Sequence, residues 1–309
     1  ASDVYKRQTV EALNTNHWAA ISTYDGYNDA QIALGNLSEN NLIAHNTLAN
    51  KGIALGAWAP ATWTSNAGSK VCCNAVAAAG VAVTYAHGPV LLGCNSGWFW
   101  PYNADGVLRI KGVAYTGDTA LWGSGAVAVN LSAQLSYEGT GDGSGVEVVF
   151  TVNGTDYPAT SIAGGSASAT VNLPPGNYTV LTKVTVCEGC EFTDSDQLVI
   201  GHLVAIDIKP GSYPNSINLK AKGVVPVAVW TTPAFDAATI DPATVLFAGA
   251  APDKWHLSDV DGDGDIDMLF HFRTQELNLT PASTQATLTG FTRAGVPFEG
   301  TDSVNIVPK

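Results

Sequence analysis

The sequence predicts an all-β protein, built from tandem β-sandwich modules that follow an irregular, β-rich N-terminal part. Three observations indicate this class. Charged residues make up only 13% of the 309 residues, so much of the polar surface must be Ser, Thr, Asn and Gly, which are poor helix formers. Apolar residues alternate with polar or small ones along several segments, which is the period of a half-buried strand. Gly, Pro, Asn or Asp bound these segments, and these residues favour turns.

The charge balance excludes partners that are themselves polyanions. The chain carries 14 Lys and Arg against 27 Asp and Glu, which gives a net charge of −13. Such a surface repels nucleic acid, so we expect no nucleic-acid partner. No run of 18 or more apolar residues occurs, so we expect no membrane span. Residues 1–8 resemble translated adapter sequence, and we expect the natural chain to begin upstream of them.

The N-terminal region, residues 1–113, has the least regular pattern. Its segment Asn36–Asn50 resembles one coil of a right-handed parallel β-helix, in which Asn residues stack at the bends. The alternative is a helix capped by Gly52, because Leu37, Ala44 and Leu48 fit a period of 3.6. The strand interpretation is favoured. No second copy follows at a fixed period, although a solenoid needs several coils, so the region is interpreted as the possible end of a β-helix.

A second interpretation of this region concerns assembly. If Val4–Leu13 is ordered, it is expected to act as an extended segment that pairs with an exposed sheet edge of a neighbouring molecule. Head-to-tail contacts of that kind build an open polymer. Five of the eight tryptophans also lie in this region: Trp18, Trp58, Trp63, Trp98 and Trp100. They are interpreted mainly as core residues, with sugar binding by exposed rings as the alternative.

The middle region, residues 114–201, shows strict alternation. Its apolar positions follow period two in the segments 127–137, 146–152, 167–173 and 178–186. Asn153-Gly154 predicts a type I′ turn, because both residues tolerate positive φ, so Val146–Val152 and Thr155–Pro158 should form a hairpin. The pattern is typical of a β-sandwich. The motifs Tyr115–Thr119 and Pro174–Tyr178 resemble those of immunoglobulin-like repeats in bacterial surface proteins, which implies an immunoglobulin-like β-sandwich here.

The C-terminal region, residues 202–309, contains a series of short apolar runs bounded by turn residues, and these predict an antiparallel all-β module. The predicted strands are Val204–Ile208, Ile217–Leu219, Val224–Thr231, Val245–Ala248, Ile266–Phe272, Gln285–Leu288 and Ser303–Ile306.

The strongest chemical motif is an aspartate loop in this region. Its five carboxylates stand at alternate positions: Asp259, Asp261, Asp263, Asp265 and Asp267. Like charges this close repel one another unless a cation binds. The spacing, with Gly264 at the sharp turn, matches a calcium loop, although Phe270 stands where an EF-hand has its bidentate Glu. We predict a structural Ca²⁺ site; the alternatives are a solvated acidic loop or another cation.

Several motifs together carry a further resemblance. They are Ile206–Asn218, Lys222–Val229, the aspartate loop, His271–Glu276 and Glu299–Ser303. In combination they resemble a terminal module widespread in secreted multidomain proteins of bacteria and archaea. The resemblance implies an exported, calcium-binding β-sandwich, and it carries no enzymatic activity with it.

The five cysteines are Cys72, Cys73, Cys94, Cys187 and Cys190. A disulfide between Cys187 and Cys190 is favoured over a redox-active pair, because the neighbouring Glu188 and Glu191 would raise a thiol pKa. Cys94 is expected to pair with Cys72 or Cys73, which leaves one cysteine over.

These features together predict a structural function outside the cell. We expect an extracellular or cell-surface protein that forms a filament, a surface layer or an adhesin stalk, with copies of itself as partners. The alternative is a carbohydrate-binding accessory region of a larger secreted enzyme, with glycans as ligands. No enzymatic activity is expected, since neither a His-Glu-x-x-His nor a Gly-x-Ser-x-Gly motif occurs.

Overall fold

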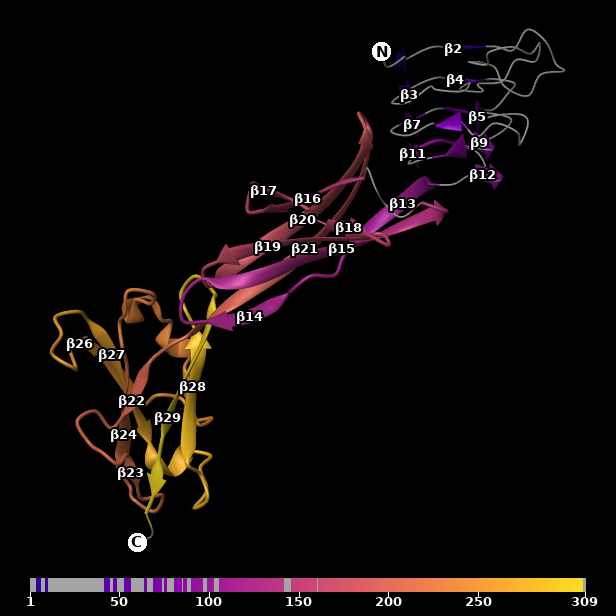
Figure 1. Ribbon diagram of the computed structural model, residues 1–309. Coiled ribbons are helices and arrows are strands. Elements are labelled where there is room, and N and C mark those ends of the chain that lie inside the picture. The colour runs from indigo at the N-terminus through magenta and orange to yellow at the C-terminus, as the bar shows by residue number, and fades with distance from the viewer. Residues whose placement is uncertain are drawn as a thin grey trace. The chain divides into compact units, whose positions relative to one another are not determined.

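Strands form most of the described part of the chain (Figure 1). The structure is a computed structural model that describes residues 106–141, 146–159 and 161–307. Before residue 106 it describes 4–6, 9–10, 42–44, 47–48, 53–56, 64–65, 69–73, 75–76, 81–84, 86–87, 90–96 and 99–102. Within these residues the helical elements are the 3₁₀ turns η1 (Ala237–Thr239), η2 (Pro242–Thr244) and η3 (Thr274–Glu276), and no helix is long and apolar enough to span a bilayer. The predicted all-β class is confirmed.

The chain divides into two compact units. The first comprises Ala1–Gly117, Asn130–Thr170 and Thr179–Asp196, and the second comprises Asp118–Val129, Val171–Tyr178 and Gln197–Lys309. Each unit therefore combines segments that lie far apart in the sequence. The expected division at residues 113 and 201 stays a prediction.

The N-terminal strands of the first unit pair in parallel, as in a β-helix. One column consists of β1 (Val4–Lys6), β3 (Leu42–Ala44), β7 (Ser69–Cys72), β11 (Val90–Gly93) and the start of β13 (Val107–Tyr115). The others are β2 (Thr9–Val10), β4 (Thr47–Leu48) and β8 (Ala75–Val76); β5 (Ile53–Gly56), β9 (Val81–Thr84) and β12 (Phe99–Tyr102); and β6 (Thr64–Ser65) with β10 (Ala86–His87).

This pairing settles two expectations. Strands at Leu42–Ala44 and Thr47–Leu48 confirm the strand interpretation of that segment over the helix. No fixed period is visible in the sequence because the connections differ in length: Val4 pairs with Leu42, Leu42 with Lys70, and Lys70 with Leu91.

The strand-donation hypothesis for Val4–Leu13 stays a prediction. Strands β1 and β2 pair with β3 and β4 of the same chain. Pairing within the chain avoids the loss of translational and rotational freedom that pairing with a second molecule entails. The described residues Val4–Lys6 and Thr9–Val10 therefore each have one strand partner within their own chain.

The middle strands are β15 (Val127–Gly139), β16 (Glu147–Val152), β17 (Thr155–Pro158), β18 (Ser161–Ala163), β19 (Ser166–Leu173), β20 (Gly176–Cys187) and β21 (Cys190–Leu203). Strands β15, β16, β19 and β20 alternate between buried and less buried residues, as predicted, and β17 and β20 pair with β16 in antiparallel orientation. Val148, Phe150 and Val152 are buried on one face of β16. The predicted β16–β17 hairpin is confirmed, with positive φ at both Asn153 (46°) and Gly154 (85°).

The second unit contains two sheets around one apolar core. One sheet has the order β22 (Ile206–Ile208), β24 (Val224–Val229), β27 (Asp267–Arg273) and β26 (Lys254–Ser258). The other contains β29 (Pro297–Ser303), β28 (Gln285–Phe291) and β25 (Leu246–Phe247), and β29 also pairs with the end of β21. Short pairs add β14 (Ala120–Gly123) beside β21, and β23 (Ser216–Ile217) beside β30 (Asn305–Ile306). The core includes the buried rings of Phe247, Phe270, Phe272 and Phe298.

Candidate metal centre

The aspartate loop connects the edge strand β26 to the inner strand β27. Gly262 and Gly264 have φ angles of 83° and 101°, a region that side chains with a Cβ rarely adopt. These two glycines turn the backbone sharply, so that the aspartates before the turns can approach the first residue of β27.

Three of the five predicted ligands converge. Asp259, Asp261 and Asp267 each place a carboxylate oxygen within 4.8 Å of the others. An all-oxygen, triply anionic set of this kind suits a hard divalent cation, and Ca²⁺ accepts its flexible geometry more readily than Mg²⁺. These residues fit the predicted ion.

Asp267 is the anchor of this cluster. Its side chain is fully buried at the start of β27. Its Oδ1 accepts a hydrogen bond of 2.9 Å from the Thr231 amide, and its Oδ2 accepts one of 3.0 Å from the Val260 amide. Hydrogen bonds to the ionised form hold this carboxylate in place. The sequence pattern carries no signal for the contribution of Thr231, which lies 36 residues away.

The carboxylates of Asp263 and Asp265 lie outside the convergent set. Asp263 Oδ1 instead accepts a hydrogen bond of 3.0 Å from the Asp265 amide. Burial, followed by the neighbouring Asp263 carboxylate, raises the pKa of Asp265 above its usual value. One oxygen of Asp265 is buried and has no hydrogen-bond partner in the described chain. Ligation by these two side chains stays a prediction.

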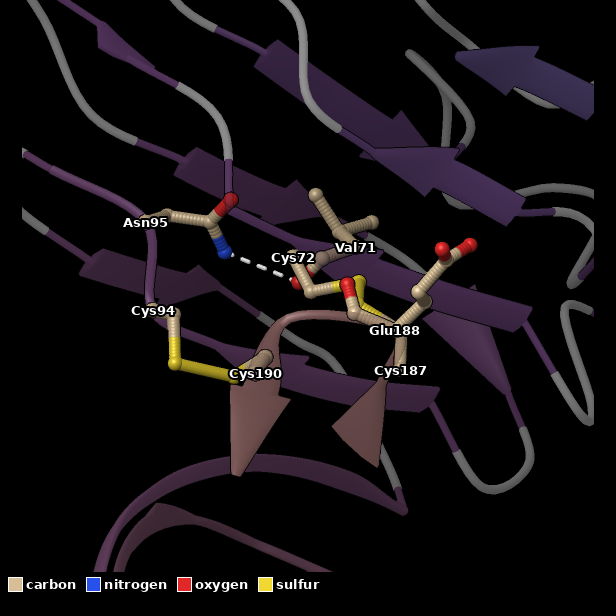
Figure 2. The surroundings of a disulfide bond; sticks show 7 residues. All are labelled: Val71, Cys72, Cys94, Asn95, Cys187, Glu188 and Cys190. Carbon is tan, nitrogen blue, oxygen red and sulfur yellow. Dashed lines mark hydrogen bonds between the residues drawn. A yellow bond between two sulfur atoms is a disulfide. The ribbon is translucent and has the colours of Figure 1, made fainter. Parts of the chain in front are cut away.

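The cysteines form a second cluster, at the tip of the β20–β21 hairpin. Figure 2 shows Cys187 bonded to Cys72 and Cys190 bonded to Cys94. The bonds link the hairpin tip to the ends of β7 and β11. Nearby, the Asn95 side-chain amide donates a hydrogen bond of 2.8 Å to the Val71 carbonyl, which ties the chain after β11 to β7.

The expected disulfide pairing was wrong. Cys187 and Cys190 flank a two-residue turn, and each bonds a different strand of the parallel column rather than its neighbour. The Cys190 sulfur packs closely against β11: a Cβ added at Gly93 would lie only 2.7 Å from Cys190 Sγ.

Cys73 is the cysteine left over, as the odd count predicted. Its Sγ lies within 4.8 Å of both sulfurs of the Cys94–Cys190 bond. Burial raises the pKa of this thiol, which keeps it protonated and poorly nucleophilic at neutral pH.

The tryptophans considered for sugar binding lie outside the described side chains. Trp18, Trp58, Trp63 and Trp98 are outside the described residues, and only the backbone of Trp100 is described, in β12.

No protein-family model matches the chain, and no curated protein matches it. Solved structures do resemble it. Fibronectin(III)-like modules of Clostridium thermocellum CbhA share 12% identity, with 64% of this chain and 94% of that chain covered and a TM-score of 0.28. A Ca²⁺-stabilised adhesin that helps an Antarctic bacterium to bind ice shares 18% identity. The match covers 67% of this chain and 51% of that chain, at a TM-score of 0.22.

A third similar structure is SGBP-B of the Bacteroides ovatus mixed-linkage glucan utilization locus, solved in complex with a heptasaccharide. It shares 11% identity at a TM-score of 0.24, with 64% of this chain covered. This chain spans 48% of that protein's length. These likenesses concern the β-sandwich fold alone.

Proposed function

We propose that the protein is an extracellular structural protein, a calcium-stabilised subunit of a surface filament, surface layer or adhesin stalk. The observation that carries the proposal is the convergence of Asp259, Asp261 and Asp267 on one point, with Asp267 buried and held by two main-chain amides. The calcium ion supplies the positive charge that this set of carboxylates lacks.

The position of the cluster supports a stabilising role. Asp267 accepts hydrogen bonds from Thr231, which follows β24, and from Val260, which follows β26. A cation on the cluster therefore fixes the connection between β26 and β27 against the chain that leaves β24. Binding that favours the folded state raises its stability by mass action.

The two disulfides support an extracellular location. They join residues 115 and 96 positions apart in the sequence, so each constrains a large part of the unfolded chain. Disulfides of this kind persist in oxidising compartments, that is, outside the cytosol.

The edge strand β26 supports association between copies. Its pairing partner in the described chain is β27, on one side. Trp255 and Leu257 on this strand are each 44% exposed. An edge strand with exposed apolar side chains is a template for pairing with another chain, and we propose a second copy of this protein as the partner.

Two experiments test the proposal. Thermal unfolding with 1 mM CaCl₂ and with excess chelator should show calcium-dependent stabilisation, and the double variant Asp259→Asn/Asp261→Asn should reduce it; equal melting temperatures in the wild type would refute the calcium role. Light scattering should show concentration-dependent assembly that Leu257→Lys prevents. The control is Leu181→Lys, because Leu181 is 38% exposed but lies on the inner strand β20. Monomers at all concentrations would refute self-association.

A second candidate function, glycan binding, is favoured by one observation. Trp122 on β14 is 43% exposed, and its ring covers Gly201 of β21, where an added Cβ would lie 2.4 Å from the ring. The glycine thus lets a flat aromatic surface lie along the sheet and face solvent. A glycan array should show binding that Trp122→Ala removes and Trp255→Ala preserves; absence of binding to any glycan would exclude this function.

A further inference from the structure

A polar cavity in the second unit lies apart from the aspartate loop in the sequence and has its own set of oxygen ligands. It has a volume of about 360 Å³. Asp207 of β22, Asp302 of β29 and Asn215, which precedes β23, line it together with the loop residues Ser212 and Tyr213. The cavity therefore gathers two acidic side chains and one amide from three separate segments.

Asn215 is the first indication that this cavity can bind a ligand. Its side chain is only 4% exposed. Its Nδ2 donates to Asp302 Oδ2 at 2.9 Å and to the Ser303 carbonyl at 3.0 Å. Both partners are acceptors, so the amide orientation is determined, and Oδ1 is the atom left over. This buried oxygen has no hydrogen-bond partner in the described chain, and leaving such an acceptor unsatisfied is costly.

The two carboxylates are the second indication. Asp302 Oδ2 also accepts a hydrogen bond of 3.0 Å from the Ile208 amide, which holds it beside β22. Burial and the charge of Asp302 both raise the pKa of Asp207. Among the described residues, no Lys or Arg forms an ion pair with either carboxylate. Two partly buried carboxyl groups thus line the same cavity without a basic side chain paired to either among the described residues.

The basic residue next to β22 in the sequence forms a hydrogen bond elsewhere. Lys209 follows β22 directly, but its Nζ donates a hydrogen bond of 2.8 Å to the Ser216 carbonyl, and it has no part in the electrostatics that shift Asp207. A ligand that suits this cavity must therefore carry positive charge and be bound through oxygen atoms.

We propose that Asp207, Asp302 and Asn215 Oδ1 bind a second calcium ion, at a site distinct from the aspartate loop. Carboxylate and amide oxygens are the ligands that Ca²⁺ takes in proteins, and its flexible geometry accepts ligands from a strand, a loop and a second sheet. A water molecule could satisfy Asn215 Oδ1, but it would leave the repulsion between the two carboxylates in place. The ion ties the loop after β22 to strand β29.

Calcium stoichiometry on the full chain tests this site. Isothermal titration of the chelator-treated protein, carried into the millimolar range that extracellular calcium modules require, should give two ions per chain in the wild type. Asp207→Asn should give one, because it removes a carboxylate of the proposed site while keeping the size of the side chain. The reciprocal variant Asp259→Asn/Asp261→Asn should also give one, and Glu276→Gln, which removes a carboxylate from η3, should still give two.

Terbium luminescence gives an independent readout of the same site. Tyr213 lines the cavity and is 92% exposed, so its excitation should sensitise a bound Tb³⁺ ion, and Tyr213→Phe and Asp207→Asn should each remove that emission. One ion per chain in the wild type, unchanged by Asp207→Asn, would overturn the second site. A stoichiometry that is unchanged by Asp259→Asn/Asp261→Asn would instead overturn the calcium role in the proposed function. The two failures are therefore distinguishable.

Discussion

Replacing Asp267 by Asn should destabilise the protein even when no calcium is present. The carboxylate is fully buried and accepts two main-chain hydrogen bonds, from Thr231 at 2.9 Å and Val260 at 3.0 Å. An amide supplies an acceptor to one of these donors and turns an NH₂ group toward the other. One buried donor is then unsatisfied, and the remaining bond loses its charge.

The expected loss is large relative to the stability of a domain. An unsatisfied buried donor and a weakened charge-assisted bond together cost about 2–4 kcal/mol in the free energy of unfolding, whereas a whole domain has about 5–15 kcal/mol. Removing one charge from the cluster also relieves repulsion, which opposes this loss. Asp259→Asn isolates that effect, because Asp259 is exposed and its Oδ1 accepts from the Gly262 amide at 2.7 Å, a bond that Asn can keep.

Urea unfolding in excess chelator measures both variants. We expect Asp267→Asn to lower the free energy of unfolding, and Asp259→Asn to leave it unchanged or raise it slightly. The same titrations in 1 mM CaCl₂ should widen the gap between each variant and the wild type, because an ion with a Kd of about 0.1–1 mM stabilises the wild type by about 0.4–1.4 kcal/mol at this concentration. Equal stabilities of Asp267→Asn and Asp259→Asn in chelator would refute the anchoring role of Asp267.

Three further predictions concern other parts of the chain. Gly154→Ala should lower the free energy of unfolding by about 1 kcal/mol, measured in urea, because an alanine at a φ of 85° is strained. Gly93→Ala should reduce the fraction of chains with an intact bond at Cys190, seen by peptide mapping without reductant, since the new Cβ would lie 2.7 Å from the sulfur; complete bonding would contradict this. Burial lowers the pKa of His202, whose ring packs 4.8 Å from that of Phe235, below its ordinary 6.5. The unfolded chain then binds more protons, so stability present above pH 6.5 is lost as the pH falls toward the lowered pKa, and the loss between pH 7.5 and 5.5 should be smaller in His202→Asn.

Local patterns predicted β22, β23, β24, β25, β27 and β28 of the second unit and the hairpin at Asn153-Gly154, but they missed β26 and β29. Alternation and turn chemistry act over a few residues, so a single sequence contains them. Strand β26 escaped prediction for a physical reason: Lys254–Ser258 lies at a sheet edge and is exposed along most of its length, so burial imposes no period on it.

The spacing of the aspartates predicted the metal site, but it could not show which side chains converge. That choice depends on Thr231 and Val260, whose amides hold Asp267. The disulfide pairing depends on the same kind of information, because the parallel column and the β20–β21 hairpin together place Cys72 beside Cys187. Proximity in sequence therefore favoured the wrong partner.

The two disulfides also determine how the chain responds to pulling. Tension applied to the termini of the oxidised protein bypasses the polypeptide between Cys72 and Cys187, which are 115 positions apart. This closed loop holds about 400 Å of contour length that cannot extend while the sulfurs remain bonded. Reduction of this bond makes the closed segment extensible. Under a tension that unfolds the protein, the reduced chain would therefore extend further than the oxidised one.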